Sequence, residues 1–274
     1  MRGDPLDYGR CWPLRLLLAA TLAFLYLPLV VLVAFSFNAG RRVTVWRGFS
    51  LEWYERLVRN PELLAALGNS LVVASFATLL SLLLGTLAAL ALWRFRFPGR
   101  IGLERGLALP ILVPEICLGV AFLVFFARVV PWPTGLPWPL SLGAIVLAHT
   151  SFLFPFVAIL VRARLESFNP ELEEAARDLG AGTWRALQDV VLPHLKPALL
   201  ASALLAFTLS LDDFVITFFT AGPDTVTFPV KVYAMVRFSV TPEVNAVSTL
   251  LLALTALLAW VGVRLQARLG GRPS

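Results

Sequence analysis

Charged residues are scarce in this chain. Asp, Glu, Lys and Arg together make up 15% of its 274 residues, whereas a soluble globular protein carries roughly 25%. Hydrophobic residues make up 58%, and several uncharged runs exceed the ~18 residues that indicate a membrane-spanning helix. The clearest of these runs are 16–37, 68–93 and 244–263. The composition excludes a soluble globular protein and predicts an all-α integral membrane protein.

Cysteine and histidine are also rare, with two residues of each type. Cys11 lies in the N-terminal tail and Cys117 lies within an apolar run. We therefore expect these two cysteines to lie far apart and to form no disulfide. His149 lies within another apolar run, which is typical of an interior histidine with satisfied hydrogen bonds. Two histidines without clustered cysteines do not make a metal site, so no metal ion is expected.

Motifs for nucleotide binding and for catalysis are lacking as well. The sequence contains no Gly-Lys-[Ser/Thr] triplet and therefore no Walker A loop. Any ATP hydrolysis that drives this protein must take place on a partner chain. The apolar runs contain no constellation of nucleophile, base or metal ligands, so we do not expect an enzyme. Basic residues flank the apolar runs instead of forming a patch interleaved with aromatics, which argues against nucleic-acid binding.

The apolar runs predict six membrane spans. Each is long enough to cross ~30 Å of hydrocarbon at 1.5 Å per residue. The first run is longer than the ~7–15 residues of a signal-peptide core, so we expect a retained helix. An even number of spans places both termini on the same side of the membrane. The predicted spans cover about 14–37, 68–93, 105–128, 140–162, 197–220 and 244–264.

The basic residues indicate which side is cytoplasmic. Of the 23 lysines and arginines, fifteen lie in the two tails and in the 94–105 and 162–196 segments. The other eight lie on the opposite side, including five arginines between residues 41 and 59. Because loops rich in Lys and Arg stay inside, this distribution predicts cytoplasmic termini.

Two further features modify the simple picture of straight spans. Pro110 and Pro114 lie in the third span, where proline removes a backbone donor and clashes with the preceding turn. A span broken in this way must be buried in protein or line a cavity. The segment 38–67 is predicted to be a short outer loop. Apolar residues between Leu51 and Val58 have helical spacing, so this loop is expected to hold a short surface helix.

The longest inner loop, 163–196, has the signals of two short helices. Asn169 is a suitable cap with Pro170 at the first helical position, and acidic residues follow in the first turns. Gly180 can adopt the left-handed conformation that ends a helix. An apolar stripe follows, formed by Trp184, Leu187, Val190 and Val191, and Leu192-Pro193 is predicted to break this second helix. On these residues alone, an amphipathic connector that rests on lipid remains an alternative.

The spacing within this loop carries a family resemblance. Glu174-Ala175-Ala176 is followed by Gly180 and, after nine residues, by Val190-Val191-Leu192-Pro193. This pattern resembles the cytoplasmic coupling loop of type-1 ABC importer permeases, with Val190 in place of the usual isoleucine. The resemblance implies that an ATPase docks on this loop, and that His194 belongs to the same contact. The residues that it assigns to coupling are Glu174, Ala175, Ala176, Asp178, Gly180, Leu192 and Pro193.

Other segments resemble one branch of that family. They are 46–54, Asn69-Ser70-Leu71, the segment 207–214 that ends in Asp212-Asp213-Phe214, and 242–246. Together they resemble the second, "C"-type permease subunit of spermidine/putrescine importers, over about residues 20–262. The resemblance implies ATP-driven import of polyamines across a bacterial inner membrane. It also implies a homologous second permease, two ATPase subunits that bind ATP and magnesium, and an extracytoplasmic binding protein. Alternatives are another small solute in the same transporter class, or an ion-gradient secondary transporter.

The same resemblance predicts the domain organisation. Residues 1–63 form the N-terminal tail, the first transmembrane helix and the outer loop. Residues 64–264 form the type-1 transmembrane domain, which includes the coupling loop 163–196. Residues 265–274 form a cytoplasmic tail.

Acidic residues within the spans are candidates for a substrate pathway. A charged side chain at the bilayer centre costs roughly 2.5–3.5 kcal/mol, so Asp212 and Asp213 must face protein or water. Carboxylates and aromatic faces suit a flexible cation, which adds Phe214 and Glu115 to the predicted pathway. The alternative for the aspartates is an ion pair with Arg128, Lys231 or Arg237, or the capping of a helix break. Glu115 could equally have a structural role beside Pro114.

Overall fold

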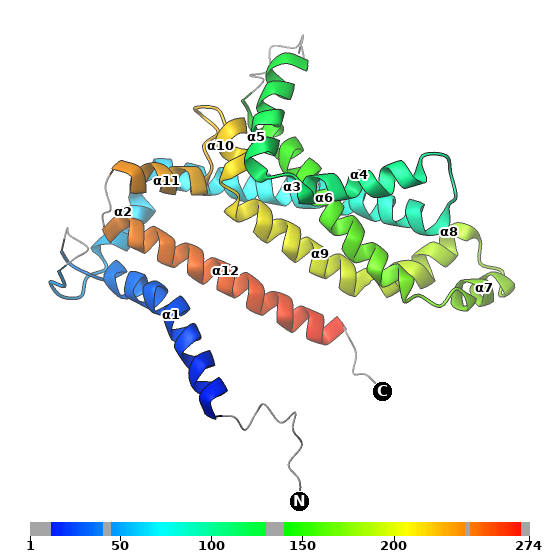
Figure 1. The fold of residues 1–274 in the computed structure, drawn as a ribbon, viewed down its shortest axis with the longest axis horizontal. Helices are drawn as coiled ribbons and strands as arrows, with labels where there is room; N and C mark the ends of the chain where they lie inside the picture. The colour runs from blue at the N-terminus through cyan, green and yellow to red at the C-terminus, as the bar shows by residue number, and fades with distance from the viewer. Residues whose placement is uncertain (1–11, 41–44, 130–139, 239–241, 270–274) are drawn as a thin grey trace, which may run out of the picture. The chain divides into compact units, whose positions relative to one another are not determined.

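The computed structural model describes residues 12–40, 45–129, 140–238 and 242–269. Cys11 and the terminal segments 1–11 and 270–274 lie outside these ranges. Within them, the regular secondary structure is helical apart from one isolated bridge between Asn38 and Phe49 (Figure 1). The expected all-α fold is therefore confirmed. The chain divides into two compact units, residues 1–60 with 234–253 and residues 61–233 with 254–274.

Five helical segments are long and apolar enough to cross a membrane. A sixth span is formed if the bent pair α4 (Arg100–Leu112) and α5 (Glu115–Val124) counts as one crossing, with π-helix η2 (Phe125–Val129) at its end. The six predicted spans thus correspond to these segments. The five continuous ones are α1 (Trp12–Ser36), α3 (Pro61–Arg94), α6 (Leu142–Glu166), Thr183–Asp212, and Pro242–Arg264 within α12 (Pro242–Leu269).

The third span is broken, as its prolines predict. The helices α4 and α5 meet at 108°, and Figure 1 shows the corner between them. The break falls at Val113, whose backbone is extended, and at Pro114. Pro110 lies inside α4. Pro114 is therefore the breaking residue, because it disfavours a helical conformation of the residue before it.

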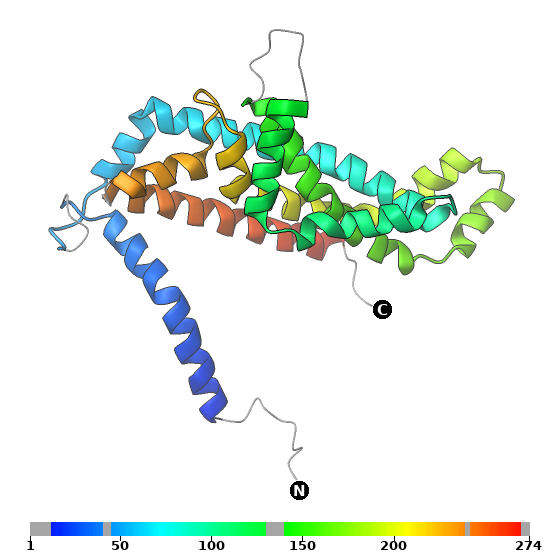
Figure 2. The same ribbon diagram turned by 45° about the horizontal axis from the view of Figure 1, so that its top comes forward.

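The core of the larger unit, 61–233 with 254–274, is built by α3, α6 and α9 (Leu192–Asp212). Small buried residues line one face of α3: Ser70, Ala74, Ala77, Ser81, Gly85 and Ala89. At Gly85 the helices approach so closely that a Cβ would lie 2.7 Å from the Phe154 carbonyl oxygen. Small residues permit such packing between membrane helices, where van der Waals contact replaces the hydrophobic effect. Figure 2 shows α3 and α6 running alongside each other.

The helix α6 supplies the larger side chains of this core. Leu153, Val157, Val161 and Leu165 recur every four residues and are fully buried. At the cytoplasmic side predicted from the sequence, Arg162 on α6 forms an ion pair with Glu104 on α4, with Nη1 and Oε1 2.6 Å apart. Leu107 on α4 packs with Leu92 of α3 and Ala158 of α6. The helix α4 is therefore fixed against both neighbours.

The smaller unit, 1–60 with 234–253, contains a set of hydrogen bonds around Asn38. The side chain of Asn38 accepts hydrogen bonds from the N–H groups of Gly40 and Arg47, and its Nδ2 donates to the Val45 carbonyl. The indole of Trp53 donates to the Asn38 carbonyl at 2.8 Å. Trp53 lies on α2 (Glu52–Arg59), which confirms the short helix expected in this segment.

Three predicted boundaries are wrong. The outer loop does not extend to residue 67, because α3 begins at Pro61, where the fixed φ of proline suits the first turn. Leu192-Pro193 does not break the chain, because helix runs from Thr183 to Asp212. The fifth span does not continue through the aspartates, because α9 ends at Asp212 and the shorter helix α10 (Val215–Thr220) follows. The physical reasons for the last two are given with the site.

Candidate functional site

The first helix of the inner loop is α7 (Glu171–Asp178), and its two ends are formed as the sequence predicts. The Asn169 side chain accepts a hydrogen bond from the Glu171 N–H at 3.0 Å, and Pro170 has helical dihedral angles. At the other end Gly180 has a φ of +89°. The N–H of Gly180 bonds to the Arg177 carbonyl and that of Ala181 to the Ala176 carbonyl. These two bonds form the Schellman arrangement that ends a helix at a left-handed glycine.

The second helix of the loop joins the fifth span without a break. The segment α8 (Thr183–Ala186) leads into the π-helix η3 (Leu187–Val191), and η3 leads into α9. Pro193 lies in the first turn of α9. Proline has no N–H for the helical ladder, and a π-turn rearranges the bonding of the preceding residues. The wide turn just before Pro193 thus accommodates it, so the chain continues as helix.

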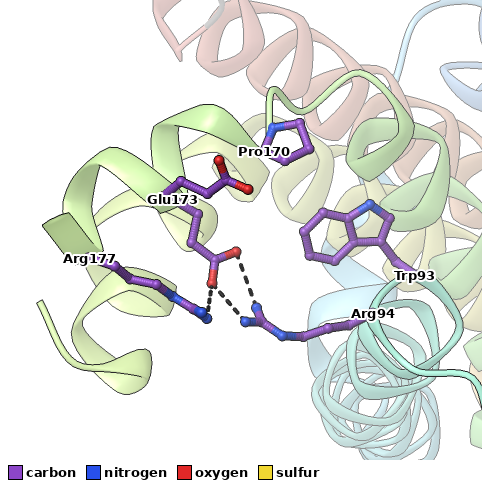
Figure 3. A pocket seen from close by; sticks show the side chains of 6 residues that line it. Trp93, Arg94, Pro170, Glu173 and Arg177 are labelled. Atoms are coloured by element: carbon purple, nitrogen blue, oxygen red, sulfur yellow. Dashed lines mark hydrogen bonds and ion pairs between the residues drawn. The ribbon is translucent and has the colours of Figure 1, made fainter.

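One side chain attaches α7 to the membrane core. Glu173 is the only buried residue of α7, and its side chain is 10% exposed. Its Oε1 lies 2.8 Å from Arg94 Nη2 at the end of α3 and 2.8 Å from Arg177 Nη2, and Arg94 Nη1 donates to Oε2 at 3.2 Å (Figure 3). The Arg94 guanidinium lowers the pKa of Glu173 below its ordinary value of 4.5. Glu173 therefore remains ionised at neutral pH.

The rest of α7 and the following turn face outward. Among the coupling residues predicted from the sequence, Glu174, Ala175, Asp178, Gly180 and Pro193 are exposed, whereas Ala176 and Leu192 are partly buried. Two large apolar side chains in the same loop are also exposed, Leu179 to 90% and Trp184 to 66%. Neighbouring exposed apolar residues mark an interaction surface when they are grouped. An open pocket of about 400 Å³ lies between α7 and the end of α3 and is lined by Trp93, Arg94, Pro170, Glu173, Glu174 and Arg177.

The two aspartates of the fifth span have different environments. Asp213 follows the end of α9, and its side chain is 8% exposed. Its Oδ2 accepts hydrogen bonds from the N–H and Oγ1 of Thr217, both at 2.8 Å. An aspartate that satisfies free N–H groups in a first turn favours a helix start at that point. Asp213 therefore caps α10, and this local bonding explains why the span is interrupted.

His149 on α6 completes the buried polar cluster around Asp213. Its Nδ1 lies 2.7 Å from Ser210 Oγ, and its Nε2 lies 2.9 Å from Thr217 Oγ1 and 3.2 Å from Asp213 Oδ2. The expectation of a satisfied interior histidine is confirmed. The alternative predicted for the two aspartates is the capping of a helix break or an ion pair with Arg128, Lys231 or Arg237, and the bonds to Thr217 agree with capping by Asp213. Of these three cations, Lys231 forms an ion pair with Glu62.

Asp212 is exposed, unlike its neighbour. It lies close enough to Glu115, in the first turn of α5, for the two carboxylates to interact electrostatically. Glu115 is exposed as well. Each carboxylate lies beside a break, Glu115 at the start of α5 and Asp212 at the end of α9. Both carboxylates are available to a partner or a solute.

Aromatic rings follow the second break. The Phe214 ring lies 4.6 Å from the Tyr233 ring on α11 (Phe228–Phe238) and 5.5 Å from the Phe218 ring, between centroids. The helix α10 packs against α5, where a Cβ at Gly119 would lie 2.6 Å from Phe219 Cδ2. The sequence predicts Phe214 as a pathway residue but not Tyr233. Tyr233 is far from Phe214 in the chain, and no motif connects the two residues. The described residues contain no group of three His, Cys, Asp or Glu side chains that could hold a metal ion.

The structure therefore combines helices that are long and apolar enough to span a membrane with a structured polar loop that is exposed between two of them. Comparison with known proteins identifies the family of this chain. A family model described as "Binding-protein-dependent transport system inner membrane component" matches residues 81–273. The chain belongs to this family and is a multi-pass inner-membrane permease of an ABC importer, a transport subunit rather than an enzyme.

Individual relatives cover most of the chain. It is 38% identical over 260 residues to the putrescine transport system permease protein PotI of Escherichia coli (strain K12), covering 94% of this chain and 91% of PotI. It is 37% identical over 241 residues to the spermidine/putrescine transport system permease protein PotC of the same strain, covering 88% and 89%. A crystal structure of a bacterial ABC transporter involved in alginate import is similar in fold, with a TM-score of 0.71 at 19% identity, covering 91% and 94% of the two chains.

Proposed function

We propose that this chain forms part of the membrane pathway of a polyamine importer and carries spermidine or putrescine inward. The exposed carboxylates of Asp212 and Glu115, each beside a break between two helices, carry this proposal. The rings of Phe214, Phe218 and Tyr233 lie just beyond Asp212. Ammonium groups favour both carboxylates and aromatic faces. The names of PotI and PotC, which match the chain over most of its length, agree with this solute class.

We further infer the partners that such a permease needs. Two ATPase subunits bind ATP and magnesium, and each docks on a coupling loop. On this chain the docking residues are Glu174, Ala175, Ala176, Asp178, Gly180, Leu192 and Pro193. A homologous second permease completes the pathway, and an extracytoplasmic binding protein delivers the solute. Closure of the ATPase dimer on ATP moves the coupling helices and opens the permease pair outward.

The orientation and organisation proposed from the sequence fit this assembly. With cytoplasmic termini, the loop 163–196 lies on the cytoplasmic side, where an ATPase can reach it. We infer that residues 64–264 act as the transmembrane domain, that residues 1–63 add the first helix and the outer segment, and that residues 265–274 form a tail. Cysteine accessibility at the exposed Leu179 and at the exposed Val58 tests this orientation from the two sides of the membrane.

Uptake of labelled spermidine and putrescine is the direct test. The chain is expressed with its partner subunits in cells that lack other polyamine importers. We expect saturable uptake that stops when ATP is depleted. Uptake of a different small solute alone would show the same class of transporter with another cargo. Uptake that persists without an ATPase and follows an ion gradient would contradict the proposal altogether.

Two substitutions distinguish a residue that contacts the solute from a residue that stabilises the fold. Asp212→Asn should lower polyamine uptake by about tenfold, without changing the thermal stability, because Asp212 is exposed. Asp213→Asn should instead lower the thermal stability, because Asp213 caps α10. Unchanged uptake in Asp212→Asn, at normal expression, would remove Asp212 from the pathway.

A further inference from the structure

An ion-pair cluster connects α7 to the end of α3, and this cluster lies beside the proposed docking surface. Glu173 is the only residue of α7 that is buried, and α7 has only eight residues. Helices of this length are marginal on their own, since helix formation has a costly nucleus. The placement of α7 therefore depends on what holds Glu173.

We propose that Arg94, Glu173 and Arg177 form a fixed joint that makes α7 move as one body with α3 during transport. This inference rests on the proposed docking of an ATPase on the coupling loop. Force applied to α7 then passes through Glu173 and Arg94 to α3. The joint stays closed in every state of the transport cycle.

The geometry of the joint favours a rigid connection. Arg94 binds both oxygens of Glu173, at 2.8 and 3.2 Å, and Arg177 binds Oε1 at 2.8 Å (Figure 3). Two-point contacts between a guanidinium and a carboxylate fix orientation as well as distance. The Glu173 side chain is only 10% exposed, so competition from water is limited. Arg177 lies on α7 itself and holds the Glu173 carboxylate in place, so the two-point contact from Arg94 is the part that restrains α7 against α3.

A second contact holds the start of α7 on the same base. Trp93, the neighbour of Arg94, packs edge-on against the ring of Phe168 at 5.8 Å between centroids. Phe168 is buried and lies just before the Asn169 cap. The His194 ring on α9 packs on the other part of Phe168 at 5.2 Å. His194 thus takes part in the internal packing of the loop, and its contact with the ATPase stays a prediction.

The base of the joint belongs to the closely packed helical core of its unit. The helix α3 lies against α6 along its face of small residues and also contacts α9. A displacement of Arg94 is consequently a displacement of α3 with its neighbours. The backbone N–H of the adjacent Glu174 bonds to the Pro170 carbonyl. Its side chain is exposed and makes no hydrogen bond or ion pair with the residues that the structure describes, so it is available to the partner. Glu173 transmits force, whereas Glu174 receives it.

A covalent replacement of the ion pair tests the joint. Cys11 and Cys117 are first replaced by serine, and Arg94→Cys and Glu173→Cys are introduced together. Without cross-linking we expect solute uptake to fall by about tenfold, a usual size for coupling between sites. The ATPase subunits should still co-purify and hydrolyse ATP. A short bifunctional thiol reagent that spans positions 94 and 173 should restore uptake toward the level of the background protein.

The controls decide between the possible failures. The single variant Arg94→Cys with the same reagent should gain nothing, and Arg94→Lys should retain part of the uptake through one remaining charge contact. Inhibition of uptake by the cross-link would show that the joint must open, and would overturn the inference. A double variant that loses the ATPase even when cross-linked would assign Arg94 and Glu173 a purely structural role, also against the inference. If no ATPase binds the background protein, the proposed function fails instead.

Discussion

His149 is the residue on which the interrupted fifth span depends. Both ring nitrogens face hydroxyl groups, and Nε2 also faces the Asp213 carboxylate at 3.2 Å. A buried carboxylate is costly unless it is paired and hydrogen-bonded. The histidine on α6 therefore stabilises Asp213 in the position from which it caps α10. Asp213 therefore has a structural role, and of the two aspartates only Asp212 is exposed.

Replacement of His149 tests this role. We expect His149→Leu to destabilise the protein by about 1–3 kcal/mol, because Asp213, Ser210 and Thr217 each lose a partner in a buried region. Thermal unfolding in detergent micelles measures the effect. Ser151→Ala is the matched control, since Ser151 is exposed on the same helix and bonds only to the Leu147 carbonyl. Equal stability of the two variants would contradict the role of His149.

Two pairs of adjacent acidic residues, Glu173 with Glu174 and Asp212 with Asp213, have roles that the sequence alone does not distinguish. The motif singles out Glu174, and the apolar run singles out Asp212 and Asp213 together. The difference between Glu173 and Glu174 arises from Arg94, which is 79 residues away in the chain. The difference between Asp212 and Asp213 arises from His149 on another helix. Such distant partners leave no local pattern, so the sequence predicts the acidic pair but not the separate roles of its members.

At the scale of helices, α3 is placed by its small residues. Gly85 lies where α3 meets α6, and a Cβ there would lie 2.7 Å from both the Phe154 carbonyl oxygen and Val157 Cβ. Gly68 lies on the same helix, but a Cβ there meets nothing within 4 Å. Replacing either glycine by alanine changes the helix propensity of α3 by the same amount. Only the change at Gly85 also affects the packing of α3 against α6, so comparing the two variants isolates the effect of packing.

We expect Gly85→Ala to lower the stability by about 1–3 kcal/mol, because the two helices must move apart to accommodate the methyl group. Gly68→Ala should be neutral or slightly stabilising, since alanine is the better helix former. Thermal unfolding of both variants in the same detergent makes the comparison. A Gly85→Ala variant that is as stable as Gly68→Ala would show that α3 and α6 are not so closely packed.

The end of α7 depends on backbone conformation alone. Gly180 has a φ of +89°, whereas Gly182 has an ordinary φ of −67°. A Cβ at either glycine would have no neighbour within 4 Å. Gly180→Ala should therefore cost about 1–2 kcal/mol of loop stability, because an L-residue is strained in this region. Gly182→Ala should cost nothing. Proteolysis within the loop measures the difference, and equally fast cleavage of both variants would argue against the left-handed turn.

Proline and aspartate explain which helix boundaries could be predicted. Pro114 breaks its span as expected, because the residue before it becomes extended. Pro193 does not break the helix, because the π-turn of η3 directly before it rearranges the backbone bonds where the N–H of proline is missing. The apolar pattern does not predict the break at Asp213, because the segments on both sides of it are apolar. The six spans follow from composition, whereas their interruptions depend on hydrogen bonds that form only in the fold.

At the scale of the whole molecule, exposed apolar surface has two different explanations. On the spanning helices it is the surface that any membrane span presents to lipid or to another spanning helix. Leu179 and Trp184 lie in the inner loop, outside the apolar spans, and are 90% and 66% exposed. Lipid does not explain a leucine at the tip of a polar, helix-ending turn. A protein partner does, and in this family the inner loop is where an ATPase is proposed to bind.

Leu179→Asp should accordingly weaken the binding of the ATPase subunit by about tenfold, or about 1–2 kcal/mol, the effect of losing an apolar anchor. The permease itself should keep its thermal stability, because the Leu179 side chain packs on almost nothing in the chain. Co-purification of the ATPase at increasing salt and dilution measures the loss. Val58→Asp is the matched control, since Val58 is 68% exposed but lies on α2, on the predicted outer side. If both variants retain the ATPase equally well, the partner binds elsewhere on the chain, and Leu179 is exposed for another reason.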